Sequence, residues 1–253
     1  MEFPIVTLAV GDAYADVYIA RLHAMLRRQL ARPHRLFCYS DRARQVPEGV
    51  ELRDCAGWTD VQRAGMRPTT RKIRFFDAAE IPFETFLYLD LTLVIARPLD
   101  ELLDAALAQK EALVVVQDWF YPSYNSCVMR IRRGPLEAVY RGFASGETYP
   151  HRIAGDQDFL HAAVAAHGLQ HEVALFPEGQ IVSYKGARRL NRTDPQAAKA
   201  LIEGATIVKF HGTPKPDQVL NPLYNFFRIG LKSRADARFW RRELRQHWTG
   251  APP

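Results

Sequence analysis

Residues 85–90 read TFLYLD and form the most regular strand-like stretch of the 253-residue chain. Aromatic side chains at Phe86 and Tyr88 alternate with leucines, which is the period-two pattern of a β-strand. The stretch ends on a carboxylate, Asp90. Because the carboxyl ends of strands border the ligand crevice of open α/β sheets, this ending predicts both a sheet and a place for chemistry.

Apolar runs and amphipathic stretches continue this pattern along the chain. Residues 3–10 and 34–39 are expected to be strands, and the helix between them has Tyr18, Leu22 and Met25 at helical spacing. Further strands are expected over residues 49–53, 112–117, 125–131, 172–176, 181–184 and 206–210, and helices over the second half of 68–79 and over 99–108, 135–143 and 156–166. This order predicts an α/β fold with a mainly parallel sheet flanked by helices.

Composition is that of an ordinary globular protein, with 47% hydrophobic and 25% charged residues. We expect one domain over residues 1–217, without repeats or linkers. Cys38, Cys55 and Cys127 are widely spaced, which argues against a disulfide framework or a zinc site and predicts a reducing cytoplasm. The first four residues do not resemble a secretion signal, and no apolar run is long enough to span a bilayer.

Residues 218–253 are predicted to be a basic, amphipathic, helical C-terminal extension. Trp240, Leu244 and Trp248 are spaced four residues apart and are surrounded by arginines. This face either docks on the domain or lies on the inner face of an anionic membrane, where it would meet a lipid-linked acceptor. The isoelectric point of about 9.3 also suggests nucleic-acid binding. We expect no nucleic-acid partner, since no recognised binding motif is present.

Polar side chains follow four of the expected strands, namely Asp12, Asp90, Asp118 and His211. Each aspartate alone could be a helix cap or a turn former, but four polar strand ends together favour a binding site. Neither GxGxxG nor GxxxxGK[ST] occurs, so a bound pyrophosphate needs a metal or basic side chains. The basic candidates are Arg71, Lys72, Lys209 and Lys215.

Five segments, in order, resemble motifs of retaining GT-A enzymes of glycosyltransferase family 8, which includes glycogenins and bacterial lipopolysaccharide glycosyltransferases. The segment YLDLTLVI at 88–95, followed by PLDEL at 98–102, resembles the DxD signature "YLDxDxxV…LDEL". The other segments are AVGDAY at 9–14, YNSCVM at 124–129, GDQDFL at 155–160 and FHGTPKP at 210–216. The resemblance spans residues 3 to 217 and implies a GT-A fold and sugar transfer from a nucleotide sugar.

The resemblance also implies nucleotide-binding residues. Tyr14 would stack on uracil, and Asp12 would lie near the base. Lys72 matches a family lysine beside the nucleotide and the donor sugar, and Lys215 would contact the diphosphate.

The sugar-binding and catalytic residues carry over in the same way. Asp118 and Asn125 would bind sugar hydroxyls, Gln157 would lie near the anomeric carbon, and Asp156 and Asp158 would position donor and acceptor. The alternative for Asp156 is a helix N-cap, and for Asn125 a turn at the strand edge.

The metal site departs from the family pattern. Mn²⁺ or Mg²⁺ is usually held by both aspartates of DxD and a histidine, yet the second position here is Thr92. Lys209 stands where the histidine is usual, and His211 follows two residues later. Three alternatives remain: Asp90 and His211 bind a weak or nucleotide-assisted metal, Lys209 replaces the metal's charge, or the site has decayed.

The sequence thus predicts a cytoplasmic hexosyltransferase that uses a nucleotide sugar, most simply a UDP-sugar, and a glycan or lipid-linked acceptor. Lipopolysaccharide biosynthesis is the context that the resemblance implies. The alternative function is a catalytically inert protein that binds sugar nucleotides or acts as a scaffold, which the neutral Thr92 would favour.

Overall fold

A computed structural model describes residues 2–221 and 239–251. The chain divides into two compact units. The first comprises Met1–Ile19, Arg32–Leu91 and Leu103–Phe176, and the second comprises Ala20–Ala31, Thr92–Leu102 and Pro177–Pro253. Neither unit ends at residue 217, so the domain boundary expected there stays a prediction.

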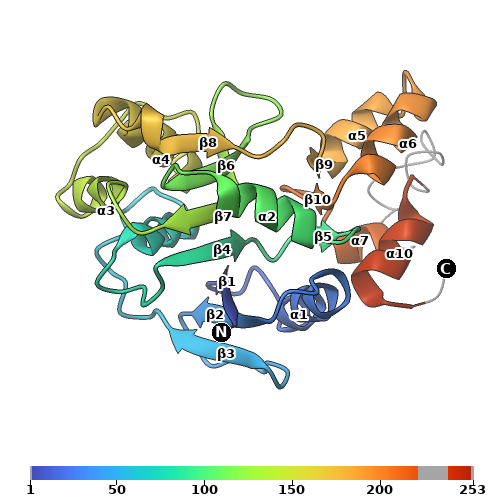
Figure 1. The fold of residues 1–253 in the computed structure, drawn as a ribbon, viewed down its shortest axis with the longest axis horizontal. Helices are drawn as coiled ribbons and strands as arrows, with labels where there is room; N and C mark the ends of the chain where they lie inside the picture. The colour runs from blue at the N-terminus through green and yellow to red at the C-terminus, as the bar shows by residue number, and fades with distance from the viewer. Residues whose placement is uncertain (1, 222–238, 252–253) are drawn as a thin grey trace. The chain divides into compact units, whose positions relative to one another are not determined.

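The first unit is built on a seven-stranded sheet (Figure 1). In spatial order its strands are β3 (Val50–Asp54), β2 (His34–Ser40), β1 (Phe3–Ala9), β4 (Thr85–Leu89), β7 (Tyr124–Arg132), β6 (Leu113–Gln117) and β8 (Val173–Leu175). Four neighbouring pairs are parallel, and β7 runs antiparallel to both β4 and β6. The mainly parallel sheet predicted from the sequence is confirmed.

The strand directions determine which residues share an edge of this sheet. Strands β1, β4 and β6 point the same way, so Asp12, Asp90 and Asp118 all follow strands at one edge. Because β7 is antiparallel, its first residues, including Asn125 and Ser126, begin at that same edge. The carboxylates and amides singled out in the sequence therefore belong to one end of the sheet.

Helices pack their apolar residues on this sheet. These are η1 (Pro68–Phe76), a 3-10 helix, and the α-helices α3 (Glu137–Ala144) and α4 (Asp156–Ala166). Phe75 of η1 is 2% exposed, and its ring centroid lies 5.5 Å from that of Tyr39 and 5.1 Å from that of Tyr88. The helix begins at Pro68, earlier than expected, since a proline with its fixed φ suits a first helical position.

The second unit contains a three-stranded sheet in the order β5 (Leu93–Ile95), β10 (Ile207–Lys209) and β9 (Ile181–Ser183). Among the described residues of this unit, its own helices are α5 (Tyr184–Leu190), α6 (Pro195–Gly204), α7 (Pro216–Leu220) and α10 (Arg241–Thr249). Helices α1 (Val17–Gln29) and α2 (Asp100–Ala108) run from one unit into the other along the chain, and a short 3-10 helix, η2 (Gln170–Glu172), precedes β8. None of the described helices is long and apolar enough to cross a membrane.

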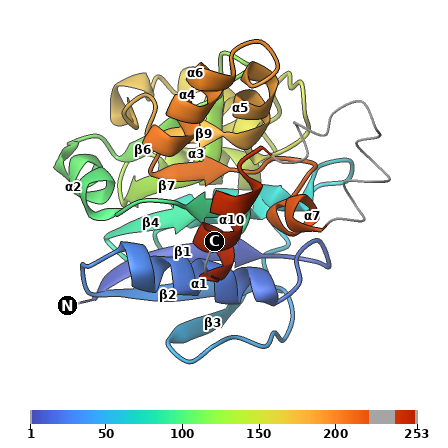
Figure 2. The same cartoon turned by 90° about the vertical axis from the view of Figure 1, so that its right-hand side faces the viewer.

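Helix α10 lies beside α7 (Figure 2) and also contacts β5, and its apolar face is buried within the second unit. Leu244 is fully buried, and Trp240 stacks on Phe210 with 6.4 Å between ring centroids. The guanidinium of Arg21 lies over the Trp248 ring and donates to the carbonyl of Thr249. Of the two interpretations of this face, docking on the protein describes the structure, and membrane contact through it has no support. The rest of the predicted extension includes residues 222–238, which lie outside the described part.

Several elements were not expected from the sequence. Strand β5 has only three residues and could not be told from a continuation of the preceding apolar run. Helix α6 did carry a signal, because the Asp194 side chain accepts from the N–H of Ala197 directly before a proline start.

Candidate active site

The carboxylate of Asp90 lies just beyond β4. The Asp90 N–H donates to the carbonyl of Cys127 in β7 at 2.9 Å, which fixes the turn after the strand. Its Oδ1 accepts from the Tyr88 hydroxyl at 2.8 Å and from the Lys72 ammonium at 2.8 Å. One oxygen of the Asp90 carboxylate thus has two protein partners.

Lys72 of η1 is the centre of a buried charge cluster. Its Nζ lies 3.4 Å from Oδ2 of Asp156, in the first turn of α4, and 3.2 Å from Oγ of Ser126. The Ser126 hydroxyl in turn donates to Asp156 Oδ2. We call Lys72, Tyr88, Asp90, Ser126 and Asp156 the Lys72 cluster. Its members come from η1, the end of β4, the start of β7 and the start of α4.

The Lys72 cluster holds one cation between two carboxylates. Burial alone would lower the pKa of Lys72, but the charges of Asp156 and Asp90 outweigh burial and raise it well above its usual value. Burial, together with Asp90, also raises the pKa of Tyr88. At neutral pH the cluster thus contains a charged lysine and a protonated tyrosine.

Asp156 does not act as the helix N-cap that the sequence left as an alternative. The N-cap is Gly155, and Asp156 is the first helical residue with its side chain 6% exposed. Its carboxylate faces Lys72 and Ser126 instead. The N-cap interpretation was wrong because a carboxylate interacts more strongly with a buried ammonium than with a neutral backbone N–H.

Asp118 and Asn125 contact each other at the same edge. Asn125 Nδ2 donates to Asp118 Oδ2 at 2.8 Å, and the other Asp118 oxygen accepts from the N–H groups of Phe120 and Tyr121. Asn125 is buried at the start of β7, and its Oδ1 also accepts from the N–H of Cys127 at 3.2 Å, so the side chain makes a local turn contact as well as the contact to Asp118. One oxygen of Asp118 thus stabilises the turn after β6, and the other oxygen binds Asn125.

The two remaining predicted catalytic residues follow in α4. Asp158 Oδ2 accepts from the N–H groups of Arg152 and Ile153 at 2.8 and 2.7 Å, so this carboxylate fixes the loop before the helix. Gln157, between Asp156 and Asp158, is partly exposed. Of the three, Asp156 joins the Lys72 cluster directly.

The turn after β1 is organised by an arginine that sequence reasoning missed. The Arg44 side chain is 1% exposed and donates to the carbonyls of Gly11 and Tyr14 at 2.7 and 2.8 Å. The Tyr14 ring lies 5.5 Å from that of Tyr18, while the Asp12 side chain is 88% exposed and pairs with an arginine on the surface. No local sequence signal distinguishes Arg44 from a surface arginine, since its partners are backbone carbonyls distant in sequence.

In the second unit, Lys209 and Thr92 form a pair. Lys209 is buried in β10, and its Nζ donates to Thr92 Oγ1 at 2.7 Å. His211 Nε2 lies 2.6 Å from Oγ of Ser183. Lys215 caps α7 at its N-terminus, where its N–H donates to a glutamine side chain.

These side chains do not fit a divalent cation held by the protein. A hard cation needs several oxygen or nitrogen ligands on one point, but Thr92 is neutral and its hydroxyl accepts from an ammonium. The Oδ1 of Asp90 is shared by Lys72 and Tyr88. Within the described part of the chain, no group of three or more His, Cys, Asp or Glu side chains is arranged to hold a metal ion.

By sequence, the chain matches neither a protein-family model nor a curated protein. Solved structures of glycosyltransferases are similar in fold. The galactosyltransferase LgtC, in complex with donor and acceptor sugar analogues, superposes with a TM-score of 0.54 at 13% identity, over 99% of this chain and 98% of that chain. The glycosyltransferase GlyE of Streptococcus pneumoniae TIGR4 gives 0.57 at 14% identity, over 99% of this chain and 62% of GlyE. Mouse xyloside xylosyltransferase 1 gives 0.54 at 14% identity, over 83% of this chain and 98% of that chain.

At such low identities these likenesses show the fold alone. The mixed, mainly parallel sheet flanked by helices is the GT-A fold that the sequence predicted. Membership of family 8 and the degenerate DxD motif stay predictions.

Proposed function

We propose that this chain is a glycosyltransferase that moves a hexose, with retention, from a UDP-sugar to a glycan or lipid-linked acceptor. The observation that carries the proposal is the Lys72 cluster. It gathers two carboxylates and an ammonium at the edge of the sheet where ligands of open α/β folds bind.

The chemistry of the cluster suits a donor sugar. A carboxylate has about four acceptor sites, more than the two partners described for Asp156, so it can accept further hydrogen bonds from sugar hydroxyls. Lys72 holds both carboxyl groups in place through its ion pairs with them. The Asp118–Asn125 pair would accept hydrogen bonds from sugar hydroxyls and donate hydrogen bonds to them.

A diphosphate requires positive charge, and Lys209 and Lys215, which the sequence predicts for it, belong to the second unit. The segments of this unit contain 18 Lys/Arg against 8 Asp/Glu, whereas those of the first unit contain 16 against 20. We propose that Lys209 and Lys215 bind the diphosphate. Tyr14, held by Arg44 through its carbonyl, would stack on the base, and Gln157 would lie beside the anomeric carbon.

A divalent cation, Mn²⁺ or Mg²⁺, is proposed to bind weakly and through the nucleotide phosphates. The donor set around Asp90 and Thr92 supports this, because neither side chain offers a cation an uncommitted pair of ligands. His211 shares its Nε2 with Ser183, so binding a metal would require that contact to break.

A donor screen tests the function. Purified protein is incubated with UDP-glucose, UDP-galactose, UDP-N-acetylglucosamine and UDP-xylose, with Mn²⁺ or with EDTA, and released UDP is measured. We expect hydrolysis of at least one donor and a loss of about 100-fold or more in Asp156→Asn. Asp104→Asn is the matched control, since this carboxylate is 59% exposed and pairs with Arg32 on the surface.

Two results would contradict the proposal. A protein that neither hydrolyses any donor nor shows a thermal shift with UDP would not be a UDP-sugar enzyme. Binding of UDP without hydrolysis or transfer would leave the inert sugar-nucleotide-binding protein as the function.

A further inference from the structure

A pocket lies in the first unit, next to the start of α4. It has a volume of about 200 Å³ and is lined by Arg63, Met66, Tyr149, His151, Asp158 and Phe159, among others. We call it the Tyr149 pocket. The function proposed above assigns it no ligand.

The walls of the Tyr149 pocket are fixed by contacts within the protein. The Arg63 guanidinium lies 3.9 Å from the ring centroid of Phe143 and donates to the carbonyl of Glu147. The Tyr149 hydroxyl donates to the Glu147 carboxylate, and its ring lies 5.2 Å from that of Phe159. Such a pocket needs little ordering when a ligand binds, which favours affinity.

The charged groups of the pocket are committed to protein partners. Asp158 accepts from two backbone N–H groups and lies 3.6 Å from the Arg152 guanidinium. Arg63 is bound to two backbone carbonyls. An uncharged ligand with hydroxyl groups and an apolar face fits this lining better than a phosphate does, because aromatic and Met side chains cover part of the wall and polar groups the rest.

The pocket adjoins the Lys72 cluster along the chain. Gly155 and Asp158 line the pocket, and the residues between them are Asp156 of the cluster and Gln157. One helical turn therefore carries the pocket wall and a proposed donor-binding carboxylate. A molecule in the pocket would lie against the same helical turn that carries Asp156.

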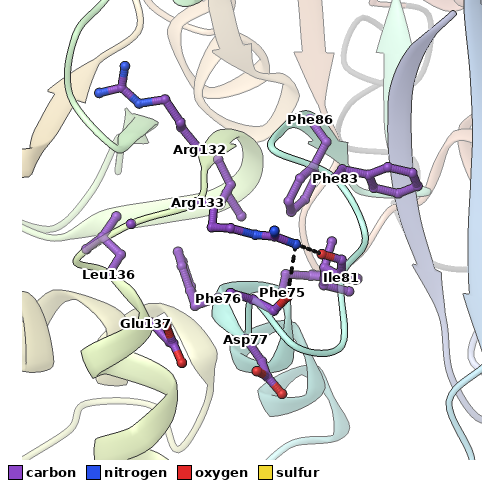
Figure 3. A pocket seen from close by; sticks show the side chains of 13 residues that line it. Phe75, Phe76, Asp77, Ile81, Phe83, Phe86, Arg132, Arg133, Leu136 and Glu137 are labelled. Carbon is purple, nitrogen blue, oxygen red and sulfur yellow. Dashed lines mark hydrogen bonds between the residues drawn. The ribbon is translucent and has the colours of Figure 1, made fainter.

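Two other cavities of the first unit are unsuited to this role. A cavity of about 10 Å³ beneath Arg133 has room for no more than one water, and the Arg133 guanidinium closes it by donating to the carbonyls of Ala78 and Ile81 (Figure 3). A groove of about 670 Å³ around Phe83 lies at the first residues of β1 and β4, at the opposite edge of the sheet from Asp90.

We propose that the Tyr149 pocket binds the uncharged terminal sugar of the acceptor. This inference rests on the proposed function, since an acceptor has meaning only for a transferase. The sugar's apolar face packs on Tyr149, Met66 and Phe159, and His151 binds its hydroxyls.

The test separates donor chemistry from acceptor binding. Ala64→Trp and Thr148→Trp each put a large ring at an exposed position of the pocket lining. With lactose and methyl β-glucoside as acceptors, we expect both variants to hydrolyse the UDP-sugar as the wild type does. Transfer should fall by about tenfold or more in kcat/KM, mainly through a higher KM. Glu84→Trp, in the groove around Phe83, is the matched control and should change neither reaction.

Each outcome decides the proposal. Unchanged transfer in both pocket variants, or equal losses of hydrolysis and transfer, would overturn it. If the wild type hydrolyses no donor, the proposed function fails, and ligand-observed NMR with the same two sugars tests the pocket alone. Sugar binding that Ala64→Trp abolishes would support the pocket as a sugar site, whereas binding of inorganic phosphate in place of either sugar, or of no probe, would overturn it.

Discussion

Replacing Lys72 by methionine should destabilise the protein strongly at neutral pH. The side chain is 8% exposed and lies 2.8 Å from Asp90 and 3.4 Å from Asp156, whose side chains are 19% and 6% exposed. Methionine fills a similar volume but leaves two carboxylates facing each other without a cation. Removing one partner of a buried ion pair costs about 3–5 kcal/mol, because the remaining charge stays buried.

This free energy corresponds to a large change in melting temperature. For a chain of this size, 1 kcal/mol shifts the midpoint by about 2–4 °C, so we expect a drop of about 6–20 °C by calorimetry at pH 7. The exposed Lys110→Met is the matched control and should stay within about 0.5 kcal/mol of the wild type. Lys72→Arg keeps the charge and should recover part of the loss.

The pH dependence identifies the cause. The raised pKa of Lys72 means that its contribution to stability is complete below the ordinary lysine pKa of about 10.4 and is lost only as pH rises through the higher folded value. The contribution of Lys72 to the stability of the wild type should thus stay constant between about pH 5 and 9. In Lys72→Met the loss of unfolding free energy relative to the wild type should shrink toward about pH 4, where the carboxylates take up protons. A variant that melts like Lys110→Met at pH 7, or whose deficit does not change with pH, would refute the electrostatic argument.

Four further predictions concern binding, the metal and stability. Lys215→Ala should weaken UDP binding by about 1.5–3 kcal/mol in calorimetry, and Tyr14→Ala should also weaken it; unchanged affinity in both would show that the nucleotide site lies elsewhere. The Thr92→Asp protein should bind Mn²⁺ in the absence of nucleotide only when Lys209→Met is also present. In the single variant the new carboxylate would pair with the Lys209 ammonium, which now donates to Thr92. Tight Mn²⁺ binding by the wild type would contradict this. Phe75→Ala should lower the free energy of unfolding by about 3–5 kcal/mol, since the ring is buried among Tyr39, Trp58 and Tyr88, and a wild-type melting temperature would be inconsistent with that packing. Burial raises the pKa of Cys38 and of Tyr39 to about 12. Their contribution to the free energy of unfolding should be complete below their ordinary pKa values and fall as pH rises from about 9 toward 12. A lower urea midpoint at pH 10.5 than at pH 8 would show this loss.

The sequence alone determined the sheet and the edge that carries the polar residues. Period-two alternation in residues 85–90 predicted β4, and the apolar runs at 3–10 and 112–117 predicted β1 and β6. These patterns are local, because a strand buried on both faces or on one face must show its burial in its own residues. The polar residue after each strand could likewise be read directly, which placed Asp12, Asp90 and Asp118 at one edge before their contacts were known.

Only the tertiary structure decided what those carboxylates contact. Asp156 pairs with Lys72 rather than capping its helix, Thr92 accepts from Lys209, and Arg44 holds the turn after β1 through backbone carbonyls. These partners are far apart in sequence, and a lysine or arginine has the same local pattern whether it is exposed or buried. The two-unit division and the Tyr149 pocket were hidden for the same reason: both arise from segments that meet only when the chain has folded, and no periodicity records that meeting.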